Sequence, residues 1–211
     1  MNKFKSEDLI HQLQSDVQHI IAAAEHLMTA DPVKLGYCMK EGQWSVAQII
    51  EHLNAYNRYY LPTMERAMAP VSKDLNAWFV SGFWGNYFTK MMMPTNIYEV
   101  KNKMKAMKSY SPDKSVNVKQ AFDEFLEHQH KIIQLLDVAK RRNLNTIRIP
   151  VSISKLIRFK LGDTFRFLIA HEQRHLIQAR NAIKAVGIST DKFPVILEAA
   201  RLQPAVSSGR S

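Results

Sequence analysis

The segment "GDTFRFLIAHEQRHLIQARNAIKAVG" (residues 162–187) gives the strongest helix signal in the chain, because its apolar residues recur at helical spacing along its whole length. Asp163 suits the N-cap position and Gly187 the residue just past the end of a helix. The helical wheel places His171 and His175 in the apolar half. The other half holds Arg166, Gln173, Arg174, Arg180, Asn181 and Lys184. We therefore predict a long amphipathic helix that buries both histidines.

Three more segments share this periodicity. The first follows Ser6 and ends near Met28. The second begins at "WSVAQIIEHL", where Ser45 and Gln48 match a capping box, and it should end or kink around Pro62. The third runs roughly from Asn117 to Arg141. Four such helices, in a chain with only seven glycines, predict an all-α four-helix bundle.

An insert separates the second and third helices. Residues 75–94, "LNAWFVSGFWGNYFTKMMMP", are rich in aromatic residues and methionine and lack a clear period. Core packing or a subunit contact, a lid over a pocket, and membrane contact are the open interpretations. A shorter helix should follow Pro94 and end near Ser111. "RIPVSIS" (148–154) reads as an extended connection.

Domain organisation follows from these elements. Residues 1–190 are predicted to form a single domain, and residues 191–211 a short helix from Pro194 followed by a flexible tail. The N-terminus lacks an apolar signal region, and no run of about 18 apolar residues occurs. Cys38 is the sole cysteine, which excludes an intramolecular disulfide and a cysteine-based zinc cluster. We therefore expect a cytoplasmic protein with no membrane partner.

The net charge is +10, from 29 lysines and arginines against 19 aspartates and glutamates. Such a charge attracts anions in general. The basic residues are dispersed along the chain, and no nucleic-acid-reading motif accompanies them. Solvated helix faces explain them, and we expect no nucleic-acid partner.

Histidines carry the chemistry of this sequence. His171 and His175 lie four positions apart, so their Cβ atoms should be about 5–6 Å apart on one helix face. Buried imidazoles need polar partners, which a metal ion, a backbone carbonyl or Glu172 would supply. His52 lies at the edge of the apolar stripe of the second helix and adds a third ligand from a separate helix. Five other histidines fall on solvent-facing or boundary positions: His11, His19, His26, His128 and His130.

Three imidazoles leave a coordination position open, which is typical of a catalytic rather than a structural site. Imidazole ligands alone do not select among zinc, nickel, iron and copper. Further groups near the ligands in helical spacing are Glu172, Gln178 and Gln48, which could orient the imidazoles. Glu172 could also accept a proton.

Two stretches carry a resemblance to a known family. "GQWSVAQIIEHLNAYN" (42–57) and the H-x3-H-x2-Q pattern of "HEQRHLIQ" (171–178) resemble, in order and separation, the signatures of the DinB/YfiT-like superfamily. The resemblance covers about residues 6–187. It implies a four-helix bundle, commonly dimeric, with a divalent metal held by His52, His171 and His175.

The resemblance also implies a class of reaction. Some members are transferases or isomerases that use a low-molecular-weight thiol such as bacillithiol or mycothiol, so we expect a metal-dependent enzyme, specifically a thiol S-transferase acting on a small molecule. The alternatives are a non-catalytic, metal-stabilised binding or stress protein and, less favoured, a zinc peptidase that reads "HEQRH" as H-E-x-x-H with Glu172 as general base. The aromatic insert and the positive charge depart from the family pattern, and they leave the substrate undefined.

Overall fold

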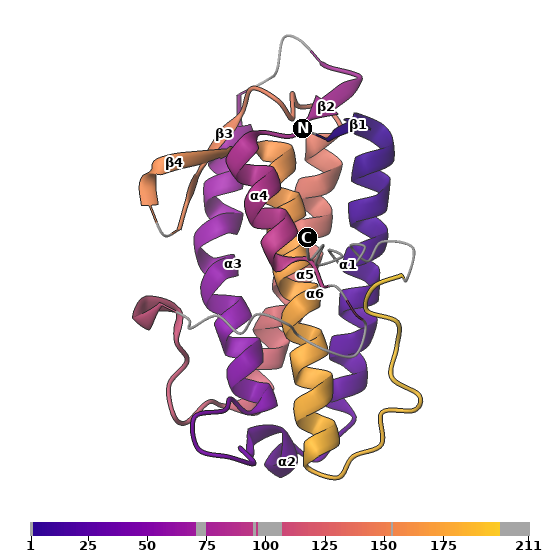
Figure 1. Ribbon diagram of the computed structural model, residues 1–211, viewed down its shortest axis with the longest axis vertical. Helices are drawn as coiled ribbons and strands as arrows, with labels where there is room; N and C mark the ends of the chain where they lie inside the picture. The colour runs from indigo at the N-terminus through magenta and orange to yellow at the C-terminus, as the bar shows by residue number, and fades with distance from the viewer. Residues whose placement is uncertain (1, 71–74, 95, 97–106, 153, 199–211) are drawn as a thin grey trace, which may run out of the picture.

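The computed structural model describes residues 2–70, 75–94, 96, 107–152 and 154–198. Four long helices pack side by side: α1 (Ser6–Met28), α3 (Val46–Met68), α5 (Val118–Ala139) and α6 (Leu161–Ala185). Figure 1 shows them aligned along the long axis of the molecule. The predicted all-α class is confirmed.

The helices α3 and α5 run in the same direction. Near their N-termini the Asn54 side-chain amide donates to the carbonyl of Ala121, and near their C-termini Arg142 donates to the carbonyl of Met68. The insert therefore carries the chain from one end of the bundle back to the other (Figure 1). Helices α1 and α6 complete the bundle, because each packs against the other and each contacts one member of the α3/α5 pair.

Local sequence explains where these helices begin. The Ser45 side chain accepts a hydrogen bond from the Gln48 backbone N–H, and the Gln48 side chain accepts one from the Ser45 N–H, which confirms the capping box of α3. Asn117 caps α5 by accepting from the Gln120 N–H. The predicted end or kink of α3 at Pro62 is not an end, because the helix continues to Met68. Buried side chains on both sides of the proline, such as Leu61 and Met64, hold this last part against the core.

The start of α6 differs from the prediction. The helix begins at Leu161 with Lys160 as N-cap, so Asp163 lies inside the first turn. Its carboxylate instead accepts a hydrogen bond from the Gly82 N–H at 2.7 Å, where α4 (Phe83–Met92) begins. Short-range sequence cannot reveal this, because the partner lies 81 residues away. The C-terminus is as predicted, with Gly187 at φ +82° just past the C-cap.

The predicted polar half of α6 is also partly buried. Gln173 is 1% exposed and Arg174 6% exposed. Helix α4 packs on α6 outside the four-helix core and covers part of that face. The two helices approach closely at Gly85, where a Cβ atom would lie 2.4 Å from the Cβ of Asp163. Helix α6 therefore contacts α4 of the insert in addition to α1 and α3 of the bundle.

Short elements complete the structure. They are α2 (Pro32–Gly36), β1 (Lys3–Lys5), β2 (Trp78–Val80), a 3₁₀ helix (Lys108–Tyr110), β3 (Arg148–Val151) and β4 (Ser154–Lys160). Strand β1 pairs antiparallel with β2, and β3 pairs antiparallel with β4. The extended connection predicted at 148–154 is therefore the first part of a β-hairpin. The helix expected after Pro94 falls largely on 97–106, outside the described residues.

The C-terminal segment is described as far as residue 198 and contains no helix between residues 191 and 198. Ile196 and Leu197 are buried, and the Phe193 ring packs edge-on against His26 of α1. Residues 199–211 lie outside the described part of the chain. None of the helices described is both long and apolar enough to cross a membrane.

Candidate metal centre

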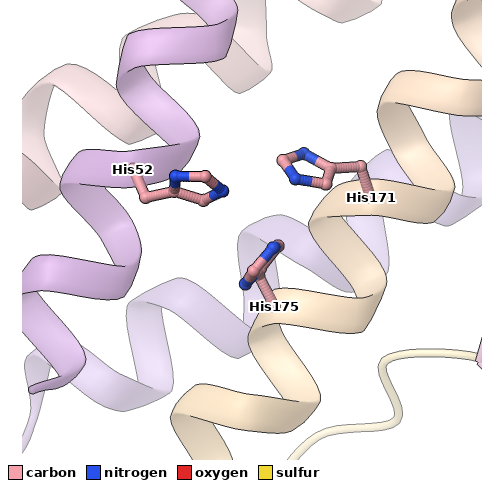
Figure 2. A group of neighbouring side chains, drawn as sticks. All are labelled: His52, His171 and His175. Carbon is pink, nitrogen blue, oxygen red and sulfur yellow. The ribbon is translucent and has the colours of Figure 1, made fainter. Parts of the chain in front are cut away.

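Three histidines from two helices converge inside the bundle. His52 comes from α3, and His171 and His175 come from consecutive turns of α6. Their ring centroids lie 5.3 Å apart for His52–His171, 4.7 Å for His52–His175 and 4.6 Å for His171–His175. One nitrogen of each ring lies within 4.8 Å of the others. Figure 2 shows the three rings grouped between α3 and α6.

Hydrogen bonds on the outer side of the cluster fix two of the rings. The Nδ1 atom of His52 lies 2.6 Å from the carbonyl oxygen of Tyr110, and the Nδ1 atom of His175 lies 2.9 Å from Oε1 of Gln178. Both partners are acceptors, so each Nδ1 carries the proton and each Nε2 keeps its lone pair. This is the tautomer that a metal-ligating histidine needs.

Burial keeps these imidazoles neutral. His52 and His171 are each 3% exposed, and His175 is half-buried. Desolvation lowers the pKa of His52, partly offset by the Tyr110 carbonyl. Desolvation, with the charges of His175 and His52, holds the pKa of His171 well below its usual value. Desolvation and His52 lower the pKa of His175 to about 3. All three are unprotonated at neutral pH, which is the state that binds a metal.

The donor set fits a divalent transition metal. Three neutral imidazole nitrogens near a common point match the three-ligand arrangement of zinc and related ions. The Nδ1 atom of His171 is buried, and no hydrogen-bond partner for it is found among the described residues. An unpartnered polar atom in this position is costly unless a ligand or solvent satisfies the ring.

Aromatic side chains surround the cluster. The Trp44 ring lies 4.9 Å from His52, and the Tyr56 ring lies 4.5 Å from His171. Tyr110 lies 4.4 Å from Tyr56, and Phe167 stacks on His171 at 6.1 Å. Burial, with Tyr60 and Tyr110 nearby, raises the pKa of Tyr56 to about 12, so its hydroxyl stays protonated. The site is therefore walled by neutral rings.

Sequence reasoning identified some of these residues and missed others. Tyr56 follows His52 by four residues, so helical spacing alone could have indicated it. Tyr110 comes from the 3₁₀ helix of the insert, and no local pattern marks it.

Three residues were predicted to orient the imidazoles, and the structure places only one of them in hydrogen-bond contact with a histidine of the cluster. Gln178 contacts His175, as predicted. Gln48 bonds to the Ser45 N–H and the Asp113 carbonyl instead, since it serves the α3 cap. Glu172 is 0% exposed, and its Oε1 accepts from the side-chain amides of Asn57 and Gln129. These bonds link Glu172 to α3 and α5, and none of its described hydrogen bonds is with the three histidines.

Desolvation raises the pKa of Glu172 to about 7, although the amides of Asn57 and Gln129 act in the opposite direction. Glu172 is thus part of a buried polar contact among three helices. That arrangement does not supply the general base that the peptidase hypothesis requires at the cluster.

The remaining histidines lie apart from the cluster, as expected. His11 is exposed, and His19 and His26 are half-buried on α1. His130 is exposed, and the Nδ1 atom of His128 lies 3.2 Å from Oδ1 of Asn54. Among the residues that the structure describes, the group that could hold an ion is His52, His171 and His175.

Comparison with known families agrees with this geometry. The sequence model of the DinB superfamily matches residues 22–179, which include all three histidines. The chain belongs to the DinB superfamily. The match spans α3, α5 and most of α6, the helices that build and frame the site. No curated protein and no solved structure matches the chain.

Proposed function

We propose that this DinB-superfamily protein is a divalent-metal-dependent enzyme in which His52, His171 and His175 are the protein ligands. The observation that carries the proposal is the convergence of one nitrogen from each ring to within 4.8 Å, in a buried and neutral cluster. Three ligands leave room for a substrate group, as catalytic sites of this type do.

We further propose a thiol S-transferase reaction. A divalent ion bound at the histidines would supply the positive charge that lowers the pKa of a small thiol. In the transfer, the thiol gives its proton to solvent, its sulfur forms a bond to an electrophilic carbon of the second substrate, and the leaving group departs with the electron pair of the bond that breaks. The protein's own task is to orient the thiol and exclude water.

Residues around the cluster support that task. Tyr110 and Gln178 hold two of the rings in orientation through Nδ1. Trp44, Tyr56 and Phe167 provide apolar walls. The positive charge of Arg174 is close enough to lower the pKa of His171 and His175, and it favours an anionic thiol over a cationic one.

Metal content tests the ligand assignment. Protein purified without chelator or added metal is assayed by elemental analysis beside His52→Ala, with His128→Ala as the matched control, because His128 is also a part-buried helical histidine. We expect about one divalent ion per chain in the wild type and in the control, and a large loss in His52→Ala. Wild-type metal content in His52→Ala would remove His52 from the ligand set.

Activity tests the reaction. Wild-type protein is incubated with bacillithiol, mycothiol or glutathione and an electrophilic acceptor, and thioether formation is followed with and without a chelator. We expect activity that is lost on chelation and restored by a divalent ion. A metal whose removal lowers the melting temperature, but whose loaded form binds neither thiols nor small anions, would favour the non-catalytic, metal-stabilised alternative.

A further inference from the structure

One end of the molecule is built from three segments that contain no aspartate or glutamate. The segments are residues 2–6, 75–94 and 143–162, and their described side chains include the cations Lys3, Lys5, Lys90, Arg148, Arg158 and Lys160. The pairing of β1 with β2, the packing of α4 against β4 and the bond from Lys160 Nζ to the Val80 carbonyl bring the three segments together. Figure 1 shows β1, β2 and the β3–β4 hairpin at this end, with α4 beginning there and running along the molecule toward its middle. We call it the basic aromatic end.

Large apolar side chains are exposed here. Phe83 is 70% exposed, Trp84 and Tyr87 are 52% each, and Trp78 is 42%. Leu156, in the β-hairpin, is 95% exposed. Phe83, Trp84 and Tyr87 form a chain of edge-on ring contacts along the outer side of α4. Exposed apolar residues that gather in this way indicate an interaction site.

Cations accompany these side chains. Lys3, Lys5, Lys90, Arg148 and Arg158 are exposed, and the Lys3 ammonium lies 4.5 Å from the centre of the Trp78 ring. Arg148 lies opposite Lys160 in the β3–β4 ladder. Lys160 donates to the Val80 carbonyl and interacts with the Asp163 carboxylate, whereas Arg148 is exposed to solvent. The surface therefore combines aromatic and aliphatic groups with an excess of positive charge, although the exposed Glu7 and Asp8 follow β1 at the start of α1.

The fold holds this surface in place. On the inner side of α4, Gly85 and Thr89 are buried, and Gly85 lies against Asp163 of α6. The aromatic side of α4 therefore faces outward, because the helix is fixed by a close backbone contact. The exposure of the aromatic rings is thus a consequence of how α4 packs on α6.

We propose that the basic aromatic end docks on an anionic lipid membrane as a peripheral contact. Trp, Tyr and Phe beside Lys and Arg are the residues that occupy the membrane–water interface. Each surface cation adds about 1 kcal/mol of attraction to anionic lipid, which is about a fivefold change in partitioning. Such docking needs no spanning segment, and it is independent of the metal site.

Two other binding partners, a single-stranded nucleic acid and a second copy of the chain, fit this surface less well. A single-stranded nucleic acid needs open ring faces for stacking, but Lys3 covers a face of Trp78, and Leu156 offers no ring. A second copy would bring together two ends that each carry an excess of positive charge, which charge repulsion opposes. An anionic surface matches both the charge and the exposed apolar groups.

Vesicle binding tests the proposal. Full-length protein is mixed at low salt with phosphatidylcholine vesicles with and without phosphatidylglycerol, and co-sedimentation and tryptophan emission are measured. We expect binding to the anionic vesicles only, a blue shift of the emission, and weakening as salt rises. Replacing Arg158 by glutamine should lower partitioning about fivefold. The change Phe83→Ser with Trp84→Ser should lower it about tenfold or more.

Matched controls are available at the opposite end of the bundle. Val33 in α2 is 77% exposed, Tyr37 at its C-cap is 58% exposed, and Lys34 is exposed in the same helix. Val33→Ser with Tyr37→Ser, and Lys34→Gln, should leave vesicle binding unchanged. Circular dichroism and metal content check that every variant is folded.

Three results would overturn the docking proposal. The first is equal loss of binding in both sets of variants, and the second is no binding to anionic vesicles at low salt. The third is preferential binding of a single-stranded oligonucleotide, or dimerisation in sedimentation analysis that the Phe83/Trp84 variant abolishes.

Discussion

The close contact between α4 and α6 makes Gly85→Ala a sensitive test of the packing. The added Cβ would lie 2.4 Å from Cβ, 2.5 Å from Cγ and 2.6 Å from Oδ2 of Asp163, a side chain that is 0% exposed. Asp163 cannot move without loosening its bond to the Gly82 N–H, and this bond holds the start of α4. The substitution therefore strains the packing and the hydrogen bond together.

The magnitude follows from three contributions. Overpacking of a filled site costs about 1–3 kcal/mol. Loss of a charge-assisted hydrogen bond costs about 1.5–3 kcal/mol. Alanine regains about 1 kcal/mol of helix propensity over glycine. We therefore expect Gly85→Ala to lower the free energy of unfolding by about 3 kcal/mol, measured by urea unfolding followed by circular dichroism.

The chain provides a matched control in Gly36, the last residue of α2. A Cβ there would meet Val118 at 3.7 Å, an ordinary contact, so Gly36→Ala should change stability by less than about 0.5 kcal/mol. In an Asp163→Gly background, the cost of Gly85→Ala should shrink, because the clashing side chain is gone. If Gly85→Ala proved as stable as the wild type, α4 would not be seated on α6 in this way.

Three further predictions concern the caps, the ion pairs and the metal. Ser45→Ala removes the α3 capping box and should cost about 1 kcal/mol in urea unfolding, so an unchanged midpoint would count against the cap. Hydrogen bonds from Arg58 lower the pKa of Glu124, so this pair contributes stability above the unfolded-state pKa of about 4.3 and loses it as the pH falls through the folded-state pKa. Glu124→Gln should therefore reduce stability by about 1 kcal/mol at neutral pH but not in strong acid, and a deficit that is equal at both pH values would argue against the pair. A divalent ion at about a hundred times its dissociation constant should stabilise the wild type by about 2.7 kcal/mol and His52→Ala hardly at all, as thermal melts with and without chelator can establish.

Sequence patterns predicted the parts of this protein that depend on neighbours along the chain. The capping box at Ser45, the terminating Gly187 and the spacing of His171 and His175 each arise from contacts within a few residues. The prediction that His52 lies near the other two histidines relied on the apolar stripe of α3 and on the family resemblance. The structure confirms that proximity.

By contrast, no pattern within a single segment predicted the environments of Asp163, Gln173 and Arg174, which depend on contacts with distant parts of the chain. Asp163 fits the N-cap pattern of its own helix, yet its carboxylate serves α4, because burial against Gly85 places it beside the Gly82 N–H. Gln173 and Arg174 fall on the polar half of the helical wheel, yet both are buried, and α4 packs on the same helix.

Local sequence patterns were enough to predict the four long helices and the shared face of His171 and His175, since periodicity and capping act over a few residues, and the family resemblance added His52. Tertiary structure alone decided what surrounds them. The Tyr110 carbonyl reaches His52 from 58 residues away, and the basic aromatic end joins segments that are remote in the chain. Such contacts arise when apolar faces are buried together, and the three-dimensional packing selects which residues meet.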